Sequence, residues 1–198
     1  MFGLFYHGVS MRQFWMIFIL ASACQLSVAD NRQADKAAVD HWLKEAMSDH
    51  RISTEEYTRL QQGYRALLEQ YPQWYAGYDG LATLAMFRDD CEQAIDYATR
   101  ANRLSQNLPS YFTLTVCNTQ LGNYYQAITA ANIALELDTS ILQNTRFLIN
   151  AALAYTELGK LEVAKNLLGM ALKADPGIKN DKAFLAVGQR LAERTARQ

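Results

Sequence analysis

The sequence predicts an all-α protein built from stacked helix pairs. A turn residue, Asp89, Gly122 or Gly159, stands five residues before an alanine, and a second alanine follows seven residues later. Alanines at this spacing lie near one face of a helix and let a neighbouring helix approach closely. The pattern recurs at offsets of 33 and 37 residues, in the alanine pairs Ala94 and Ala101, Ala127 and Ala134, and Ala164 and Ala171.

This pattern resembles the tetratricopeptide repeat, a family of helix pairs stacked into a right-handed superhelix. The resemblance covers about residues 75–176 and implies repeats at 75–106, 108–139 and 141–176. One pair cannot bury its apolar face alone, so the pairs must stack. Large side chains on the first helix of each pair supply the bulk opposite the alanines: Tyr78, Leu81, Tyr111, Leu114, Leu148 and Tyr155.

Further helices are expected on both sides of the three repeats. A helix-permissive run at 33–48 is followed by Ser53 and Glu56, which form a capping box for a helix ending near Pro72. Residues 33–72 are therefore expected to form an N-terminal helix pair, either a degenerate repeat or a cap. At the other end, residues 180–196 are expected to form a capping helix with an apolar stripe. Its opposite face is expected to be solvated and carries Arg190, Arg194 and Arg197.

Residues 1–29 resemble a secretory signal peptide, which leaves residues 30–198 as a single helical domain. An apolar run at 14–21 is shorter than a membrane span, and 27–29 offers the small residues that signal peptidase recognises. An alternative stays open, because residues 20–24 also resemble a bacterial lipobox, in which Cys24 is lipidated. We expect a periplasmic protein, or else an outer-membrane lipoprotein that faces the periplasm.

Cys91 and Cys117 are the two cysteines that remain if Cys24 is removed with the signal peptide. In a tetratricopeptide stack they would lie at neighbouring ends of antiparallel helices, and export brings them into an oxidising compartment. We therefore expect a disulfide between Cys91 and Cys117. Two free buried thiols are the alternative.

Composition and motifs argue against an enzyme. The chain has 19 basic and 20 acidic residues among 198, with a formal net charge of -1, so nucleic acid and anionic membranes are not expected partners. It contains no HExxH or CxxC metal motif, no GxSxG nucleophile motif and no phosphate-binding glycine loop. We expect no catalytic residues, no metal ligands and no cofactor.

The resemblance places a partner-binding surface on the concave side of the stack, lined by the first helix of each pair. Asp79 and Thr83 stand where members that grip acidic C-termini carry Lys and Asn, which argues against such a ligand. We expect a protein or peptide partner, bound as an amphipathic helix or an extended segment, unless a helix of the chain itself fills the groove. The residues implied for this surface are Asp79, Thr83, Met86, Phe87, Phe112, Val116, Thr119, Gln120, Arg146, Ile149, Leu153 and Thr156.

These expectations together indicate a non-catalytic protein–protein interaction scaffold or adaptor of the bacterial envelope. Small exported stacks of this kind resemble assembly or pilot factors of pilus and secretion machines. The alternative function is an accessory subunit that positions an envelope enzyme acting on the cell wall.

Overall fold

The computed structural model describes residues 37, 41 and 52–197. The predicted signal peptide, Cys24 and nearly all of the expected helix at 33–48 lie outside the described residues. All regular structure between residues 52 and 197 is helical, with eight α-helices and two short 3-10 helices. This confirms the predicted all-α class. None of these helices is both long enough and apolar enough to cross a bilayer.

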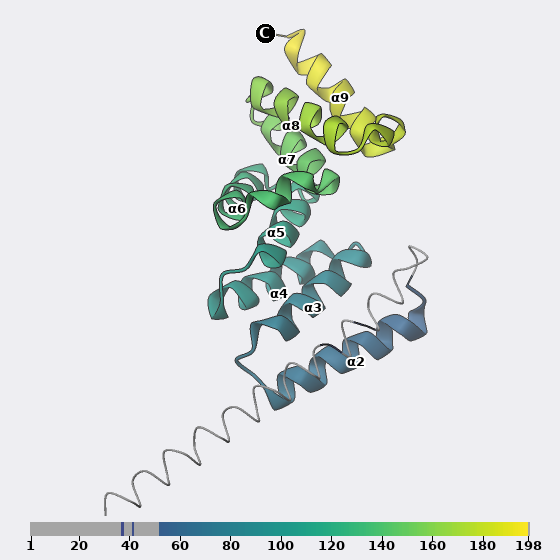
Figure 1. The fold of residues 1–198 in the computed structure, drawn as a ribbon, viewed down its shortest axis with the longest axis vertical. Coiled ribbons are helices and arrows are strands. Elements are labelled where there is room, and N and C mark those ends of the chain that lie inside the picture. Colours follow the sequence, from purple (N-terminus) through teal and green to yellow (C-terminus); the bar gives the residue numbers. More distant parts are fainter. Residues whose placement is uncertain (1–36, 38–40, 42–51, 198) are drawn as a thin grey trace, which may run out of the picture. The chain divides into compact units, whose positions relative to one another are not determined.

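The helices follow the predicted pairs (Figure 1). The α-helices are α2 (Thr54–Gln70), α3 (Tyr75–Phe87), α4 (Cys91–Leu104), α5 (Leu108–Gln120), α6 (Tyr124–Leu137), α7 (Thr145–Glu157), α8 (Leu161–Ala174) and α9 (Lys182–Thr195). Two short 3-10 helices, η1 (Thr139–Gln143) and η2 (Pro176–Asn180), precede α7 and α9. Because of η1, the first helix of the third pair begins four residues after the predicted start of that repeat at residue 141.

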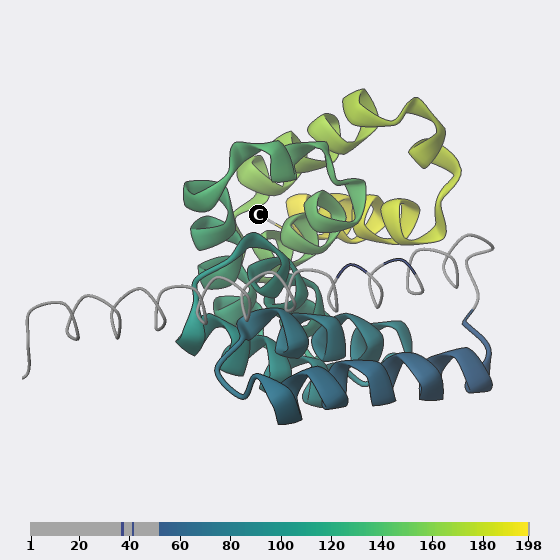
Figure 2. The same ribbon diagram turned by 60° about the horizontal axis from the view of Figure 1, so that its bottom comes forward.

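The first helices of successive pairs lie on the inner side of the stack. α3 contacts α5, α5 contacts α7, and α7 contacts α9, whereas α4, α6 and α8 each pack on the helix that follows them. Figures 1 and 2 place α2 and α3 at one end of this stack and α8 and α9 at the other. Because the first helices of neighbouring pairs contact one another directly, they form the concave side of the stack.

One left-handed residue shapes each tight turn within a pair. Gly122 and Gly159 have φ angles of 78° and 73°, and Asp89 occupies the equivalent position with a φ of 56°. Aspartate is among the few residues other than glycine that adopt this conformation at moderate cost. The shared turn geometry explains why the same spacing to the following alanine recurs in all three pairs.

The repeated alanines form the closely packed seams of the stack. All six are completely buried, which confirms the role predicted for them. Phe147 and Leu148, at the start of α7, are also completely buried and belong to the main apolar core together with Ala164 and Ala171. Small residues on one helix therefore make room for large side chains on its neighbour.

α2 packs on α3 over two glycines, with the Tyr64 ring above Gly80 and the Leu68 side chain above Gly77. A β-carbon at Gly80 would lie 2.1 Å from the Cε1 atom of Tyr64, and one at Gly77 would lie 2.9 Å from the side chain of Leu68. Burial, followed by the nearby charge of Asp79, raises the pKa of Tyr64 to about 12. The tyrosine therefore stays neutral at physiological pH, and the absence of a side chain at Gly80 is what admits its ring.

Two ion pairs to one carboxylate link α9 to α7. The carboxylate of Glu157, whose side chain is only 6% exposed, pairs with both Arg190 and Arg194. The two arginine side chains are 56% and 41% exposed, so their face is solvated as expected, and in addition they pair with a buried carboxylate. Their partner stands 33 and 37 residues earlier, on a helix that comes beside α9 only in the folded stack.

Two exposed glycines should respond to alanine in opposite directions. Gly169 lies inside α8, and a β-carbon there would have nothing within 4 Å, so Gly169→Ala is expected to stabilise the protein by roughly 0.5–1 kcal/mol through lower unfolded-state entropy. Gly122→Ala is expected to destabilise it by roughly 1–2 kcal/mol, because its φ is left-handed. Urea unfolding of both variants measures the difference, and equal effects of the same sign would contradict the turn geometry.

Candidate protein-binding groove

A cavity of about 520 Å³ opens on the inner side of the stack, between α5, α7 and α9. Ile149, Leu153 and Val187 contribute apolar walls, and Gln120 and Arg146 contribute polar groups. An apolar cavity with a few polar groups is typical of sites that orient a peptide or small ligand. The cavity therefore lies on the side of the stack where the sequence predicts a partner.

The structure brings four of the twelve predicted surface residues together at this cavity, namely Gln120, Arg146, Ile149 and Leu153. Gln120 is exposed, and a further set is half-buried: Asp79, Thr83, Phe87, Phe112, Arg146 and Leu153. The remaining five are buried within the helix packing: Met86, Val116, Thr119, Ile149 and Thr156. The surface available to a partner is consequently smaller than the predicted one.

Internal hydrogen bonds explain why several predicted residues face other helices. The Thr119 hydroxyl donates to the carbonyl of Thr115 and lies 3.3 Å from the carbonyl of Asn150, which ties α5 to α7. The Ser110 hydroxyl donates to the Asp79 carboxylate and ties α5 to α3. The helical period of the sequence places such residues on the inner face. In the structure, their short polar side chains form hydrogen bonds between neighbouring first helices instead of facing a partner.

Arg146 is a charged group of the groove that has no ion-pair partner among the described residues. Its side chain is half-buried at the start of α7, beside the apolar wall of the cavity. The nearby Asp181 carboxylate instead accepts hydrogen bonds from the backbone N–H groups of Ala183 and Phe184 at the start of α9. Asp181 lines the same cavity but makes no ion pair with Arg146. A partly buried cation that forms no ion pair among the described residues favours a ligand that brings a carboxylate.

Cys91 and Cys117 meet beside the groove as free thiols. Both are buried, in one apolar cluster that includes Met86 and Val116. Burial is the main cause that raises the pKa of both thiols. The Cys91 thiol also donates to Gln120 Oε1 at 2.8 Å. The two cysteines share one buried cluster, while the bond itself is not formed in this structure and stays a prediction.

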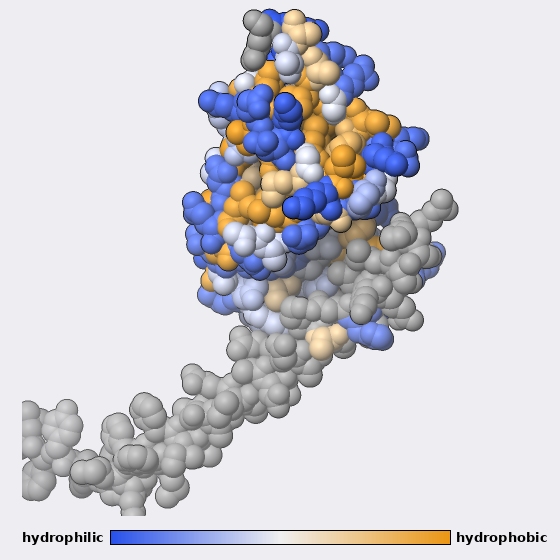
Figure 3. Space-filling model, turned by 45° about the horizontal axis from the view of Figure 1, so that its top comes forward, coloured by the Kyte–Doolittle hydropathy of each residue, from blue (hydrophilic) through white to orange (hydrophobic). Residues whose placement is uncertain are grey.

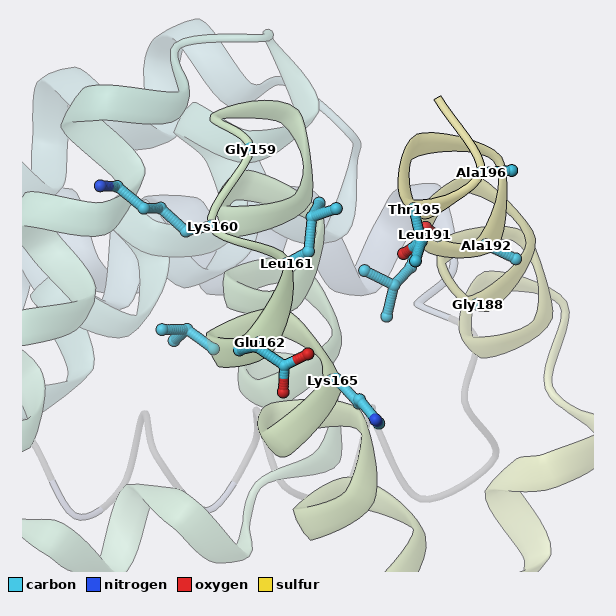
Figure 4. A pocket seen from close by; sticks show the side chains of 11 residues that line it. Gly159, Lys160, Leu161, Glu162, Lys165, Gly188, Leu191, Ala192, Thr195 and Ala196 are labelled. Carbon is cyan, nitrogen blue, oxygen red and sulfur yellow. Dashed lines mark hydrogen bonds between the residues drawn. The ribbon is translucent and has the colours of Figure 1, made fainter. Parts of the chain in front are cut away.

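A larger cavity, of about 820 Å³, lies away from the groove between the start of α8 and the end of α9 (Figure 4). Leu161 and Leu191 point toward it from the two helices. At the preceding junction between two pairs, the Tyr155 hydroxyl donates to Asn132 and bridges α7 to α6. The equivalent positions 37 residues later are Ala192 and Gly169, which have no side-chain groups able to form such a bridge between α9 and α8.

The face at this end of the stack mixes apolar and hydrophilic residues (Figure 3). Exposed large apolar side chains on α8 and α9 include Val163, Met170 and Leu185, of which Leu185 is 54% exposed. They are separated along the helices by charged residues such as Glu162 and Lys165. This end is therefore a capping surface with scattered apolar contacts, whereas the groove combines a concave shape with the charge of Arg146.

Within the described part of the chain, no three His, Cys, Asp or Glu side chains gather closely enough to hold a metal ion. His41, one of the described residues, is exposed. The groove itself is lined by apolar side chains together with the polar groups of Gln120 and Arg146.

Described residues 52–197 have the fold of a tetratricopeptide-repeat protein. The solved structure of YrrB, a TPR protein with an unusual peptide-binding site, is similar with a TM-score of 0.54 and 17% sequence identity, covering 71% of this chain and 78% of YrrB. TTC0263, a thermophilic TPR protein of Thermus thermophilus, gives a TM-score of 0.48 and 19% identity, covering 89% of this chain and 97% of that protein. No family model matches the sequence, and no curated protein does either.

Proposed function

We propose that this protein is a non-catalytic interaction module of the bacterial envelope that binds a segment of a partner protein in its concave groove. Its role would be to hold that partner during assembly of a larger envelope structure, such as a pilus or a secretion machine. The bound segment carries a large apolar side chain for the cavity between α5, α7 and α9. It also carries a carboxylate for Arg146.

The single observation that carries this proposal is the half-buried Arg146, without an ion-pair partner among the described residues, beside the apolar cavity of about 520 Å³. The fold supports it, because a stack of this kind presents a continuous inner surface, and YrrB is itself described as having a peptide-binding site. Export rests on the signal-like residues 1–29.

Affinity purification from envelope extracts of the native host tests the proposal. The full chain is compared with Leu153→Arg, which places a charge in the apolar cavity, and with Tyr125→Arg, a matched substitution on α6 at a side chain that is 75% exposed. A protein that co-purifies with the wild type and with Tyr125→Arg, but not with equally stable Leu153→Arg, is expected. If the same partner co-purified with all three proteins, binding in the groove would be contradicted.

The same purified material shows how the chain is processed. Intact mass spectrometry distinguishes a mature chain that begins after residue 29 from one that begins at a lipidated Cys24. We expect the first form. A full-length chain recovered only from the cytoplasm would overturn the envelope assignment while leaving the groove experiment valid.

A further inference from the structure

We propose that Cys91 and Cys117 form a dithiol–disulfide pair whose oxidation state determines which group Gln120 contacts at the groove. The effect on partner binding rests on the proposed function, whereas the chemistry of the pair and its effect on Gln120 do not. Cys117 packs with Cys91 in the core, and Cys91 in turn is hydrogen-bonded to Gln120 at the wall of the groove.

Two helices bring the thiols together. Cys91 is the first residue of α4, directly after the turn that contains Asp89, and Cys117 lies one turn before the end of α5. Their side chains pack in one buried apolar cluster, on facing parts of α4 and α5. A disulfide requires two cysteines whose Cα atoms lie within about 7 Å of each other, and packing in one cluster favours that geometry.

Cys91 connects this pair to the groove. Its thiol donates to Gln120 Oε1 at 2.8 Å, and Gln120 lines the cavity with Arg146 and Leu153. In the reduced protein, this hydrogen bond turns the Gln120 carbonyl oxygen toward Cys91. A disulfide has no S–H donor, so oxidation removes this contact and leaves the amide of Gln120 available to the cavity and its ligand.

The reaction is ordinary thiol–disulfide exchange. The Cys91 thiolate attacks the disulfide of an oxidant, which is either a disulfide oxidoreductase or oxidised glutathione, and one thiolate of the oxidant leaves. Cys117 then loses its proton and displaces the second thiolate. In total two S–H bonds are lost, one S–S bond joins α4 to α5, and the oxidant gains two electrons and two protons as two thiols.

Cys91 is the expected attacking group. It lies at a helix start next to an exposed turn and is 4% exposed, whereas Cys117 is completely inaccessible. Burial raises the pKa of both thiols, but interaction with Cys117 lowers the pKa of Cys91, whereas interaction with Cys91 raises the pKa of Cys117, so Cys91 is favoured as the thiolate. Because both sulfurs are buried, exchange takes place when the turn before α4 opens or while the chain folds.

The test uses the mature protein labelled with ¹⁵N, reduced with dithiothreitol or oxidised with glutathione disulfide. Alkylation and mass spectrometry count the free thiols, and NMR follows the side-chain amide signals of Gln120, which are identified by their loss in Gln120→Ala. We expect oxidation to protect both cysteines from alkylation after denaturation. It should also shift the Gln120 signals.

Two substitutions at one position separate the disulfide from the lost hydrogen bond. Cys91→Ser keeps a donor and cannot form the bond, so its Gln120 signals should stay unchanged when oxidant is added. Cys91→Ala has no donor, so its signals should differ from the reduced wild type under both conditions. Full alkylation of the oxidised wild type, or a disulfide that leaves the Gln120 signals unmoved, would overturn the inference. A shift of Gln120 in a protein whose groove captures no partner would leave the inference standing and reject the proposed function alone.

Discussion

Phe147→Ala is expected to lower the free energy of unfolding by about 3–5 kcal/mol, since truncating a buried aromatic side chain loses its transfer free energy and leaves a cavity. Phe147 is completely buried in the main core at the start of α7. The loss is large relative to the stability of about 5–15 kcal/mol that is typical of natural domains. Urea unfolding followed by circular dichroism measures the change.

Leu185→Ala is the matched control for this substitution, because Leu185 is a large apolar residue that is 54% exposed on α9. Its effect should stay within about 0.5 kcal/mol, as for most surface substitutions. If the two variants lost similar stability, Phe147 would not occupy the central position in the core that the structure gives it.

Gly80→Ala is expected to cost about 1–3 kcal/mol, the usual range for overpacking a filled interface. The added methyl group would lie 2.1 Å from a ring atom of Tyr64, and that ring is 1% exposed and has little room to move. Thermal unfolding should show a clear decrease in Tm. Gly188→Ala, also inside a helix but with nothing within 4 Å of the new carbon, should not lower it.

A double-mutant cycle identifies Tyr64 as the cause of this loss. Tyr64→Leu removes the ring that meets Gly80, so Gly80→Ala should cost less in that background than in the wild type. The stability losses of the two single variants should therefore add up to more than the loss measured for the double variant. Strict additivity would mean that α2 does not pack on α3 through this contact.

Period and residue size made the stack predictable from the sequence. Ala127 and Ala134, like their equivalents in the other pairs, have side chains short enough to mark helix seams, and Gly122 marks a turn by its conformational freedom. Capping is also local: the structure confirms the Ser53 capping box and has Asp181 as the N-cap of α9. Such features depend on residues within one or two helical turns of each other.

Features that depend on contacts between distant helices were not predictable in this way. Glu157 meets Arg190 and Arg194 only because α9 docks on α7, and no local pattern pairs them. Likewise, helical spacing cannot tell a residue that lines a groove from one buried between first helices, as Val116 and Thr156 are. The sequence predicts Arg146 on the first helix of the third pair, where the structure has it. The charges around its guanidinium depend on the helices packed beside α7, which the sequence pattern does not give.

Site-specific photo-cross-linking in the native envelope tests the central claim, that partners bind on the concave side. A benzoylphenylalanine probe replaces Phe112, a half-buried aromatic residue of α5, and in a control replaces Tyr125, an exposed aromatic residue of α6. We expect a partner protein cross-linked through Phe112 and absent from the Tyr125 control. Partner adducts only at Tyr125, or adducts at Phe112 that join the chain solely to itself, would contradict the claim.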